Sequence, residues 1–445
     1  MGTVFSLEKR MICLTKNSLL KIMKKNIWIW ALAATTLMTA CSQDNDPIGE
    51  ESKQEVTDND WISPDGQVVV QLGGVDNASA NAIITRGPIK DDGSNFFYDL
   101  TSNPQNPNTV GIFALASDKA GWTDNDNYGI LLNNIEGIGS TETKSVTDGA
   151  LRDNLNKITL KGTSTWGGVY YYPMKIKYNY DFYGYAPYVA GESVSSIDTQ
   201  ISYTNFNGSQ DIMFCKASAN PISAGAIYTD DKKATNTDVL SGYNAKYIRQ
   251  LKYHKELNTG DKQDYPWIPN LAFEHQLVWL KFSVVVAKNQ SAGDKTAAAN
   301  QLEVKDIKLK GHPTTVDLDL QANDANRLAW GTTTGDLPIL NLDTDVVVTD
   351  TFAPEDTETP TVRGYLLVRP SKTYTVSLTV VPKTSGNGVQ PESQTFDVEL
   401  KNGEIGFEKG KSYSIRLGIY ALQEVEATAE LTPWGNDVVI DIPVE

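Results

Sequence analysis

The chain contains three cysteines and three histidines, the residue types best suited to covalent or metal chemistry. Cys13 and Cys41 flank an apolar stretch near the amino terminus, whereas Cys215 lies in a strand-like run, DIMFC, and we interpret it as a small buried hydrophobic residue. The histidines lack ligand spacing such as HxxxH, and no GxSxG, P-loop or CxxC motif occurs, so the motifs predict neither an enzyme nor a bound cofactor or metal. The histidines are His254, His275 and His312.

Cys41 stands in a context that indicates lipidation. Two lysines at positions 24 and 25 form a positive region, residues 27–37 form an apolar core, and the string LMTAC resembles the lipobox of bacterial lipoproteins. In such signals the cysteine sulfur receives a diacylglycerol, the chain is cut just before it, and the new amino terminus is acylated. Because the apolar core is shorter than the roughly 20 residues that span a bilayer, we expect residues 1–40 to be a cleaved signal peptide.

The residues around this signal have two further consequences. Residues 1–22 carry scattered charges ahead of a second methionine, so we interpret Met23 as the true start. Residues 41–60 are polar, acidic and nearly free of apolar side chains, which predicts a flexible tether. The mature chain is therefore expected to be anchored to the outer membrane by its acyl chains and not to span it.

The net charge excludes one class of partner. The whole sequence carries a formal charge of −16, and residues 1–40 hold six Lys or Arg against one Glu, so the mature chain carries about −21. Nucleic-acid binding requires a basic surface, which an acidic chain of this kind does not supply. We therefore expect no nucleic-acid partner.

From Trp61 onward, short apolar runs separated by Gly, Pro and Asn predict an all-β fold. The run at 67–72, QVVVQL, is followed by two glycines, which predicts a strand that ends in a turn. In the last third of the chain, apolar residues alternate with polar ones, as in antiparallel sandwiches with one apolar face per strand. The predicted strands cover residues 67–72, 82–85, 110–116, 128–132, 316–320, 374–380, 396–400, 413–419 and 425–431.

The spacing of these runs predicts two domains. Charged residues without an alternating pattern occur between Ala217 and Pro269, so we place the domains at 61–225 and 226–445. Within Leu271–Val286 the apolar face shifts by one residue, which predicts a bulge or bend.

Several segments, taken together in their order and spacing, resemble the fimbrillin family, the lipoprotein-derived pilins of type V pili and their accessory subunits. The resemblance covers nearly all of the mature chain. It rests on the motif at Cys41, ITRG at 84–87, YYYP at 170–173, DFYGYAPY at 181–188, DIMF at 211–214, NLAFEHQLVWLKF at 270–282, KGKSYSIRLGI at 409–419 and ATAELTPW at 427–434.

This resemblance implies two transthyretin-like, Greek-key β-sandwich domains in tandem, export to the cell surface, no enzymatic activity, and cleavage by an arginine-specific protease. The residue that matches the cleavage position is Arg86, followed by Gly87 in a TRGP string that is also typical of an ordinary exposed turn. Cleavage there would release the anchor together with the strand at 67–72. A strand of another pilin subunit would then fill the apolar groove and build a fimbrium by strand addition.

The carboxyl-terminal residues 437–445 offer such a donor strand. Every second residue of this segment is apolar, so these side chains share one face of an extended strand. They are Val438, Ile440, Ile442 and Val444. The alternative is that residues 437–445 form the last strand of the chain's own second sandwich.

An aromatic cluster between Trp166 and Tyr188 leaves another function open. Aromatic rings stack on sugars, but strands are also rich in aromatic core residues, and we favour the core interpretation. A glycan-binding lipoprotein that does not polymerise is therefore the main alternative to a pilin. A β-sandwich hydrolase is a weaker one, because no pair of carboxylates can be singled out from the sequence.

Overall fold

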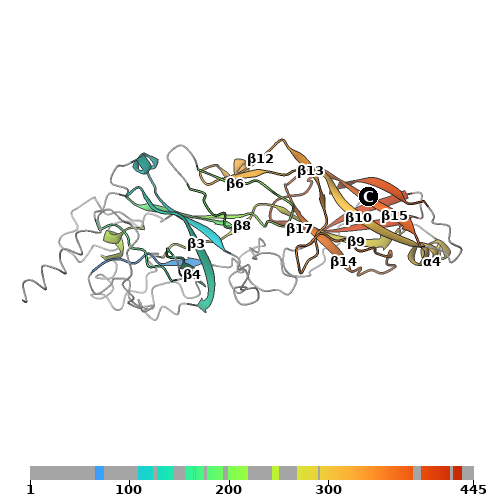
Figure 1. The fold of residues 1–445 in the computed structure, drawn as a ribbon, viewed down its shortest axis with the longest axis horizontal. Coiled ribbons are helices and arrows are strands. Elements are labelled where there is room, and N and C mark those ends of the chain that lie inside the picture. The colour runs from blue at the N-terminus through green and yellow to red at the C-terminus, as the bar shows by residue number, and fades with distance from the viewer. Residues whose placement is uncertain are drawn as a thin grey trace, which may run out of the picture. The chain divides into compact units, whose positions relative to one another are not determined.

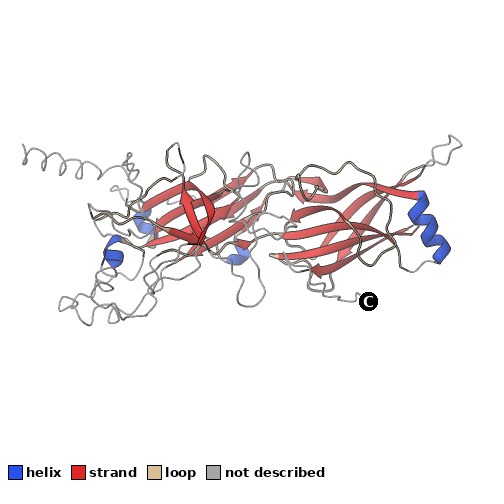
Figure 2. Ribbon diagram, turned by 90° about the horizontal axis from the view of Figure 1, so that it is seen from below, coloured by secondary structure: helices blue, strands red, loops and turns tan. Residues whose placement is uncertain are grey.

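Strands dominate the computed structural model of this chain, and the prediction of an all-β fold is confirmed (Figure 1; Figure 2). All described residues belong to one compact unit, Val56–Glu445. The structure describes residues 66–74, 109–123, 128–143, 156–163, 165, 167–174, 178–193, 199–218, 243–249, 268–288, 291–383, 392–420 and 424–432.

The first half of the chain forms a seven-stranded antiparallel sheet in the order β1-β4-β3-β2-β5-β7-β8. Strand β2 coincides with the predicted run at 110–116, whereas β3 extends well beyond the predicted 128–132. The strands are β1 (Leu72–Gly74), β2 (Val110–Ala116), β3 (Ile130–Thr143), β4 (Asn156–Leu160), β5 (Tyr180–Ala186), β7 (Met213–Ala217) and β8 (Glu274–His275).

Both faces of this sheet are buried at β2. In β2, Ile112 and Ala114 belong to one apolar cluster, while Phe113 and Leu115 belong to another. Because alternate side chains of a strand point to opposite faces, an unbroken apolar run such as β2 requires cover on both sides. All seven residues of β2 are buried.

A three-stranded sheet, β12-β11-β6, contributes to the cover of one face. Strand β6 (Gln200–Tyr203) precedes the second half in sequence, but β11 (Val316–Asp319) and β12 (Leu328–Trp330) lie within it. Strands β6 and β11 pair in antiparallel register. Two side-chain hydrogen bonds also connect β11 to β6 and to the residue just before it. Thr199 Oγ1 donates to Asp319 at 2.6 Å and Ser202 Oγ donates to Asp317 at 2.8 Å. The β11–β12 hairpin therefore completes the sandwich of the other half.

The second half consists of two four-stranded sheets, β13-β10-β15-β16 and β14-β9-β17-β18. Strands β9 and β17 run parallel, an exception to the antiparallel pairing that was predicted. Parallel neighbours cannot be joined by a short hairpin, and these two are far apart in the sequence. The strands are β9 (Val278–Val286), β10 (Leu302–Pro313), β13 (Thr334–Pro338), β14 (Val362–Val368), β15 (Thr373–Pro382), β16 (Gln394–Lys401), β17 (Lys411–Tyr420) and β18 (Glu424–Thr432).

The irregularity predicted within Leu271–Val286 marks the place where the chain passes from one sheet to another. Strand β8 ends at His275 and pairs with β7, whereas β9 begins at Val278 in the second half. Residues 243–248 and 268–273 contribute to the apolar cluster of the first half. We therefore propose a boundary near Gln276 in place of the boundary between residues 225 and 226.

Helix α4 (Ala292–Gln301) could not be predicted from the periodicity of apolar residues. It buries only Ala298, so it has no apolar stripe. Its start is nevertheless encoded, because Ser291 accepts a hydrogen bond from the Asp294 N–H at 3.2 Å, as an N-cap does. Among the described residues, 245–249 are also helical, and short 3₁₀ turns lie at Lys119–Thr123 (η3) and Asp324–Asn326 (η4).

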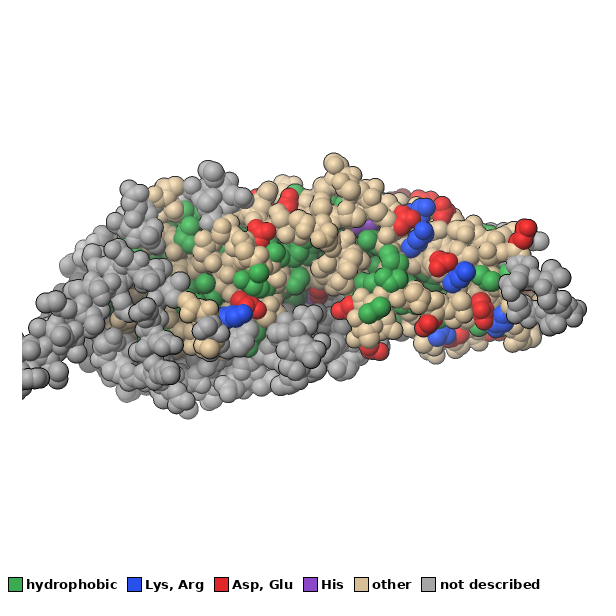
Figure 3. Space-filling model, in the orientation of Figure 1, with side chains coloured by type: hydrophobic (Ala, Val, Ile, Leu, Met, Phe, Trp, Pro, Cys, Tyr) green, Lys and Arg blue, Asp and Glu red, His purple; other side chains and the backbone are tan. Residues whose placement is uncertain are grey.

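The surface of the second half mixes charges of both signs. In Figure 3, Lys and Arg side chains lie beside Asp and Glu on the visible face. One such group joins Lys308 and Lys310 of β10 to Asp336 of β13, at 3.3 and 3.7 Å. Mixed charge of this kind keeps a surface soluble without creating a one-sign field.

Candidate functional site

Residues 66–74, here called the edge segment, lie at the margin of the seven-stranded sheet. The predicted strand within it is present as extended, buried chain: Val68, Val70 and Leu72 are 0%, 7% and 4% exposed. These side chains have the two-residue spacing of one strand face, and they belong to the same apolar cluster. The edge segment therefore covers part of the first half's core.

Backbone hydrogen bonds hold the first part of the edge segment. The Val70 N–H donates to the Tyr170 carbonyl at 2.7 Å, and the Tyr172 N–H donates to the Val68 carbonyl at 2.9 Å. Val69 and Tyr171 form the bridge between these two bonds. This is antiparallel strand pairing, which depends on main-chain atoms and tolerates many side chains.

Gly73 holds the second part. Its N–H donates to the Pro269 carbonyl at 3.0 Å, and its carbonyl accepts from the Leu271 N–H at 2.7 Å. On its other side it pairs with Lys157 of β4. The two glycines predicted to form a turn are thus paired strand residues, because a glycine lets two neighbouring backbones approach it closely.

The residues that pair with the edge segment are almost free of solvent. Ile158 and Leu271 are 4% and 0% exposed, and Tyr172 is 2% exposed. The Tyr172 ring lies 6.2 Å from Tyr180 and 6.3 Å from Phe182, centroid to centroid. Burial raises the pKa of the Tyr172 hydroxyl well above its usual value. Removing the edge segment would uncover an apolar, aromatic groove.

β1 lies at the end of the order of named strands, where it pairs with β4 on one side while Gly73 bonds residues 269–271 on the other. Strands β4 and β3 separate it from β2, the next described strand in sequence, so the edge segment is not half of a tight hairpin. Its removal would leave the order of the other named strands unchanged.

Several predicted site residues lie outside the described residues. These are Cys41, Arg86, Gly87, Val438, Ile440, Ile442 and Val444. Their roles in lipidation, cleavage and strand donation stay predictions. Among the described residues, no helix has the length and apolar character needed to cross a membrane.

The described aromatic residues of the cluster between Trp166 and Tyr188 are mostly core residues. The Tyr185 hydroxyl, for example, donates to Asn134 Oδ1 at 2.7 Å inside the first half. Six of these rings are at most 5% exposed: Tyr170, Tyr172, Tyr180, Phe182, Tyr183 and Tyr185. Buried rings cannot stack on a sugar, so the structure favours the core interpretation of this cluster.

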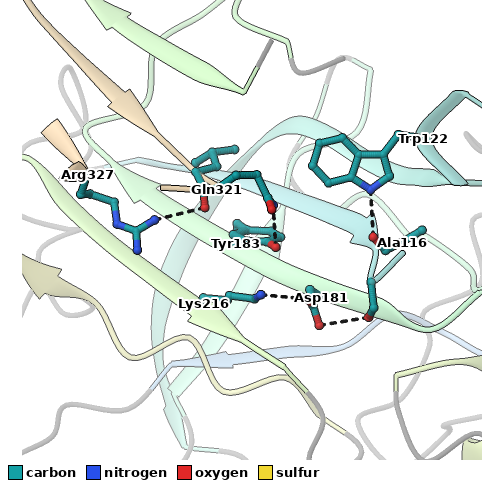
Figure 4. Close-up of polar contacts among 9 residues, drawn as sticks. Ala116, Trp122, Asp181, Tyr183, Lys216, Gln321 and Arg327 are labelled. Atoms are coloured by element: carbon teal, nitrogen blue, oxygen red, sulfur yellow. Dashed lines mark hydrogen bonds and ion pairs between the residues drawn. The ribbon is translucent and has the colours of Figure 1, made fainter. Parts of the chain in front are cut away.

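The rim beside Tyr183 shows how such rings are covered (Figure 4). Lys216 Nζ lies 5.1 Å from the centroid of the Tyr183 ring and pairs with Asp181 at 2.9 Å. Gln321 Nε2 donates to the Tyr183 hydroxyl at 2.7 Å, which ties the β11–β12 connection to β5. The chain's own polar groups therefore occupy this rim.

Arg327 covers the neighbouring ring in the same way. Its guanidinium carbon lies 3.8 Å from the centroid of the Phe214 ring, and its Nη1 donates to the carbonyls of Asp319 and Leu320, both at 3.1 Å. Burial lowers the pKa of the Arg327 guanidinium, whereas the carboxylates of Asp324 and Asp319 act to raise it. Cation–π contacts of this type seal an aromatic edge without binding a ligand.

Cys215 is the described free cysteine, and it is 4% exposed in β7. Burial raises the pKa of its thiol well above the usual value. A protonated, buried thiol is a poor nucleophile, which agrees with its interpretation as a small core residue.

Comparison with known proteins adds a family to this geometry. A family model described as fimbrillin-like matches residues 115–434, which include strands of both halves. No curated protein matches the chain.

Three solved structures are similar at low identity. A protein from Bacteroides uniformis ATCC 8492 with a provisional role in cell adhesion is 14% identical, covers 84% of this chain and 99% of its own, and has a TM-score of 0.40. A fimbrial assembly protein from Parabacteroides distasonis ATCC 8503 is 9% identical, with 82% and 93% covered and a TM-score of 0.28. The tip fimbrial protein Mfa3 from Porphyromonas gingivalis is 9% identical, with 82% and 98% covered and a TM-score of 0.34.

Proposed function

We propose, from the premise that this chain belongs to the fimbrillin-like family, that it is a structural or accessory subunit of a cell-surface fimbria. In this proposal the chain is exported as a lipoprotein through Cys41, cut after Arg86 by an arginine-specific protease, and assembled by exchange of a β-strand. The observation that supports the proposal is the edge segment, an extended stretch whose Val68, Val70 and Leu72 are buried in the apolar cluster of the first half. Arg86 follows the edge segment in the sequence, so cleavage there separates it from the rest of the chain.

The contacts of the edge segment are of kinds that another strand can reproduce. It buries Val68, Val70 and Leu72, its backbone bonds to residues 170–172 and 269–271, and its last three residues pair with β4. Main-chain hydrogen bonds and alternating apolar side chains are what a donated strand supplies in strand addition.

The carboxyl-terminal segment matches the edge segment in pattern. Residues 68–72 read VVVQL and residues 438–442 read VVIDI: three β-branched residues, one polar residue and one branched apolar residue. The same alternation would place Val438, Ile440 and Ile442 where the edge segment buries its side chains. Pro443 would then fall at the position of Gly73, whose N–H is used, so the match ends at Ile442.

Gel electrophoresis and amino-terminal sequencing test this proposal. Wild-type surface fimbriae should give SDS-resistant ladders in unboiled samples, and their subunits should begin at Gly87. Arg86→Lys should stop cleavage and polymerisation, because the protease requires arginine. Polymerised subunits that begin at Cys41 would overturn the cleavage step.

A deletion tests the donor strand separately. Removing residues 437–445 should leave a folded, lipidated monomer that does not polymerise. A monomer whose melting temperature falls by many degrees would instead show that this segment closes the chain's own second sandwich. Cys41→Ala is the control for export, and it should abolish fatty-acid labelling.

A further inference from the structure

His312, near the end of β10, lies where three parts of the chain meet. It is 2% exposed, and its ring stacks on Phe206 at 5.3 Å and meets the edge of Trp330 at 5.1 Å between centroids. Phe206 belongs to residues 204–212, the loop that follows β6 in the first half, and Trp330 belongs to β12. The imidazole is therefore part of the contact between the two halves.

The hydrogen bonds of His312 fix its protonation state by geometry. Nδ1 lies 2.7 Å from the Pro313 carbonyl oxygen, which can only accept, so Nδ1 must carry the proton. Nε2 lies 3.0 Å from the Arg369 backbone N–H, which can only donate, so Nε2 must present its lone pair. A second proton on Nε2 would place two donors against each other and break the bond to Arg369.

The groups around the ring also disfavour a positive charge. The loop 204–212 presents Phe206 and β12 presents Trp330, neither of which titrates, and the connection from β14 to β15 presents the cationic Arg369. The nearby Asp336 of β13 accepts from the Gly311 N–H at 3.2 Å. The pKa of His312 is lowered to about 4, chiefly by burial and also by the Arg369 charge, while the hydrogen bond to the Pro313 carbonyl acts in the opposite sense.

The loop that His312 supports is attached to the second half by few other bonds. The Leu367 N–H donates to the Gly208 carbonyl at 2.8 Å, and the Phe206 N–H donates to the Thr314 carbonyl at 2.8 Å. A Cβ at Gly208 would lie 2.7 Å from Leu366, so the loop fits closely against β14. Loss of the His312 contact therefore removes a central support of this loop.

We propose that His312 is an acid-sensitive latch between the two halves of the chain. The neutral imidazole joins Phe206, Trp330 and the Arg369 backbone. In acid, protonation of Nε2 sets two donors against each other and breaks the Arg369 bond, so that the ring loses the position in which it supports Phe206 and the loop 204–212 is released from β10 and β14.

The second buried histidine provides a matched control. His275 Nδ1 lies 2.9 Å from Oδ1 and 2.8 Å from Oδ2 of Asp211, at the other end of the same loop. Its partner is a carboxylate, which accepts hydrogen bonds, whereas the partner of His312 Nε2 is a donor. His275→Gln therefore removes a buried histidine at the same loop and leaves the bonds of His312 in place.

Urea unfolding at pH 7, 5.5 and 4 tests the latch in wild type, His312→Gln and His275→Gln. The unfolded chain takes up the His312 proton below its ordinary pKa of 6.5, but the folded chain resists it until about 4, so stability is present above this window and lost as pH falls through it. Between pH 7 and 4 the unfolding constant of wild type should therefore rise by about 100-fold relative to His312→Gln, whose amide can accept the Arg369 bond but cannot titrate. His275→Gln should keep the steep pH dependence of wild type.

Two measurements on wild-type protein keep the test decisive if His312→Gln does not fold. Nitrogen NMR of labelled histidine should show His312 in the neutral form with the proton on Nδ1 at pH 6. Hydrogen exchange of the Arg369 N–H should accelerate between pH 6 and 4, although hydroxide-catalysed exchange slows in that direction. A His312 ring that is protonated at pH 6 while the Arg369 N–H stays protected would overturn the proposal.

Discussion

The two halves of the chain obtain their cover in different ways. The second half builds both of its sheets from β9, β10 and β13–β18, all from one stretch of sequence. The first half depends on the edge segment at its own amino-terminal end and on the β11–β12 hairpin, which lies between β10 and β13 in the sequence of the second half. The self-contained half is therefore expected to be the stable scaffold, and the half with separable cover is the place where strands can be exchanged.

Expressing the two halves as separate fragments should reveal the largest difference in stability between them. Residues 61–225 alone lack the β11–β12 hairpin, so Ile201 and Tyr203 of β6, which are 0% and 6% exposed, lose their cover. They also lack Leu271 and Phe273. We expect this fragment to show no cooperative unfolding transition in circular dichroism.

A fragment of residues 277–432 is the matched control for the separation. It retains both four-stranded sheets, and we expect it to unfold cooperatively. A folded 61–225 fragment, or an unfolded 277–432 fragment, would remove the distinction between a dependent and a self-contained half.

A charge in the edge segment should have the next largest effect. Val70→Asp places a carboxylate in the apolar cluster, and we expect it to destabilise the uncut chain by about 3–5 kcal/mol in urea unfolding. The same substitution cannot act on a chain that begins at Gly87. Ile415→Asp in β17, a residue that is 0% exposed, should destabilise both forms. If Ile415→Asp left the stability of both forms unchanged, the second half would not be the scaffold.

Sequence reasoning located strands better than it located their partners. Alternation at Val316 and Leu318 indicates that one face of β11 is buried, but it does not indicate that β6 lies beside it, because pairing is a long-range property. The shift before Val278 was visible, and only the structure shows that it is a change of sheet. The edge segment was found as a strand because its apolar run is continuous.

The His312 contact had no sequence signal that could have revealed it. The residue stands in KGHPTT, a polar string without ligand spacing. Its backbone partner Arg369 is 57 residues away, and its stacking partner Phe206 lies in the other half. Contacts between parts so distant in sequence depend on the assembled fold, which local patterns do not encode.

Breaking the buried His275–Asp211 hydrogen bond near the joint should have an intermediate effect. The His275 and Asp211 side chains are 0% and 3% exposed, so Asp211→Asn leaves a buried imidazole without its carboxylate. Loss of a buried hydrogen-bond partner costs about 1–3 kcal/mol. We expect Asp211→Asn to lower the free energy of unfolding by that amount at pH 7, measured with urea. A loss below about 1 kcal/mol would mean that the pair does little to hold the loop 204–212.

The exposed pair at the rim of the first half should have the smallest effect. The Lys216 and Asp181 side chains are 43% and 14% exposed, so water and salt screen their attraction. Lys216→Met keeps an apolar stem over the Tyr183 ring and removes only the charge. We expect a loss of less than about 1 kcal/mol in the free energy of unfolding, and a still smaller loss at high salt. Asp211→Asn, measured in the same salt series, should change little, because its pair is buried. Lys216→Met could instead lower the free energy of unfolding as much as Asp211→Asn does. The exposed pair would then stabilise the first half as much as the buried pair. The cover of the first half would in that case be held more strongly than its topology indicates.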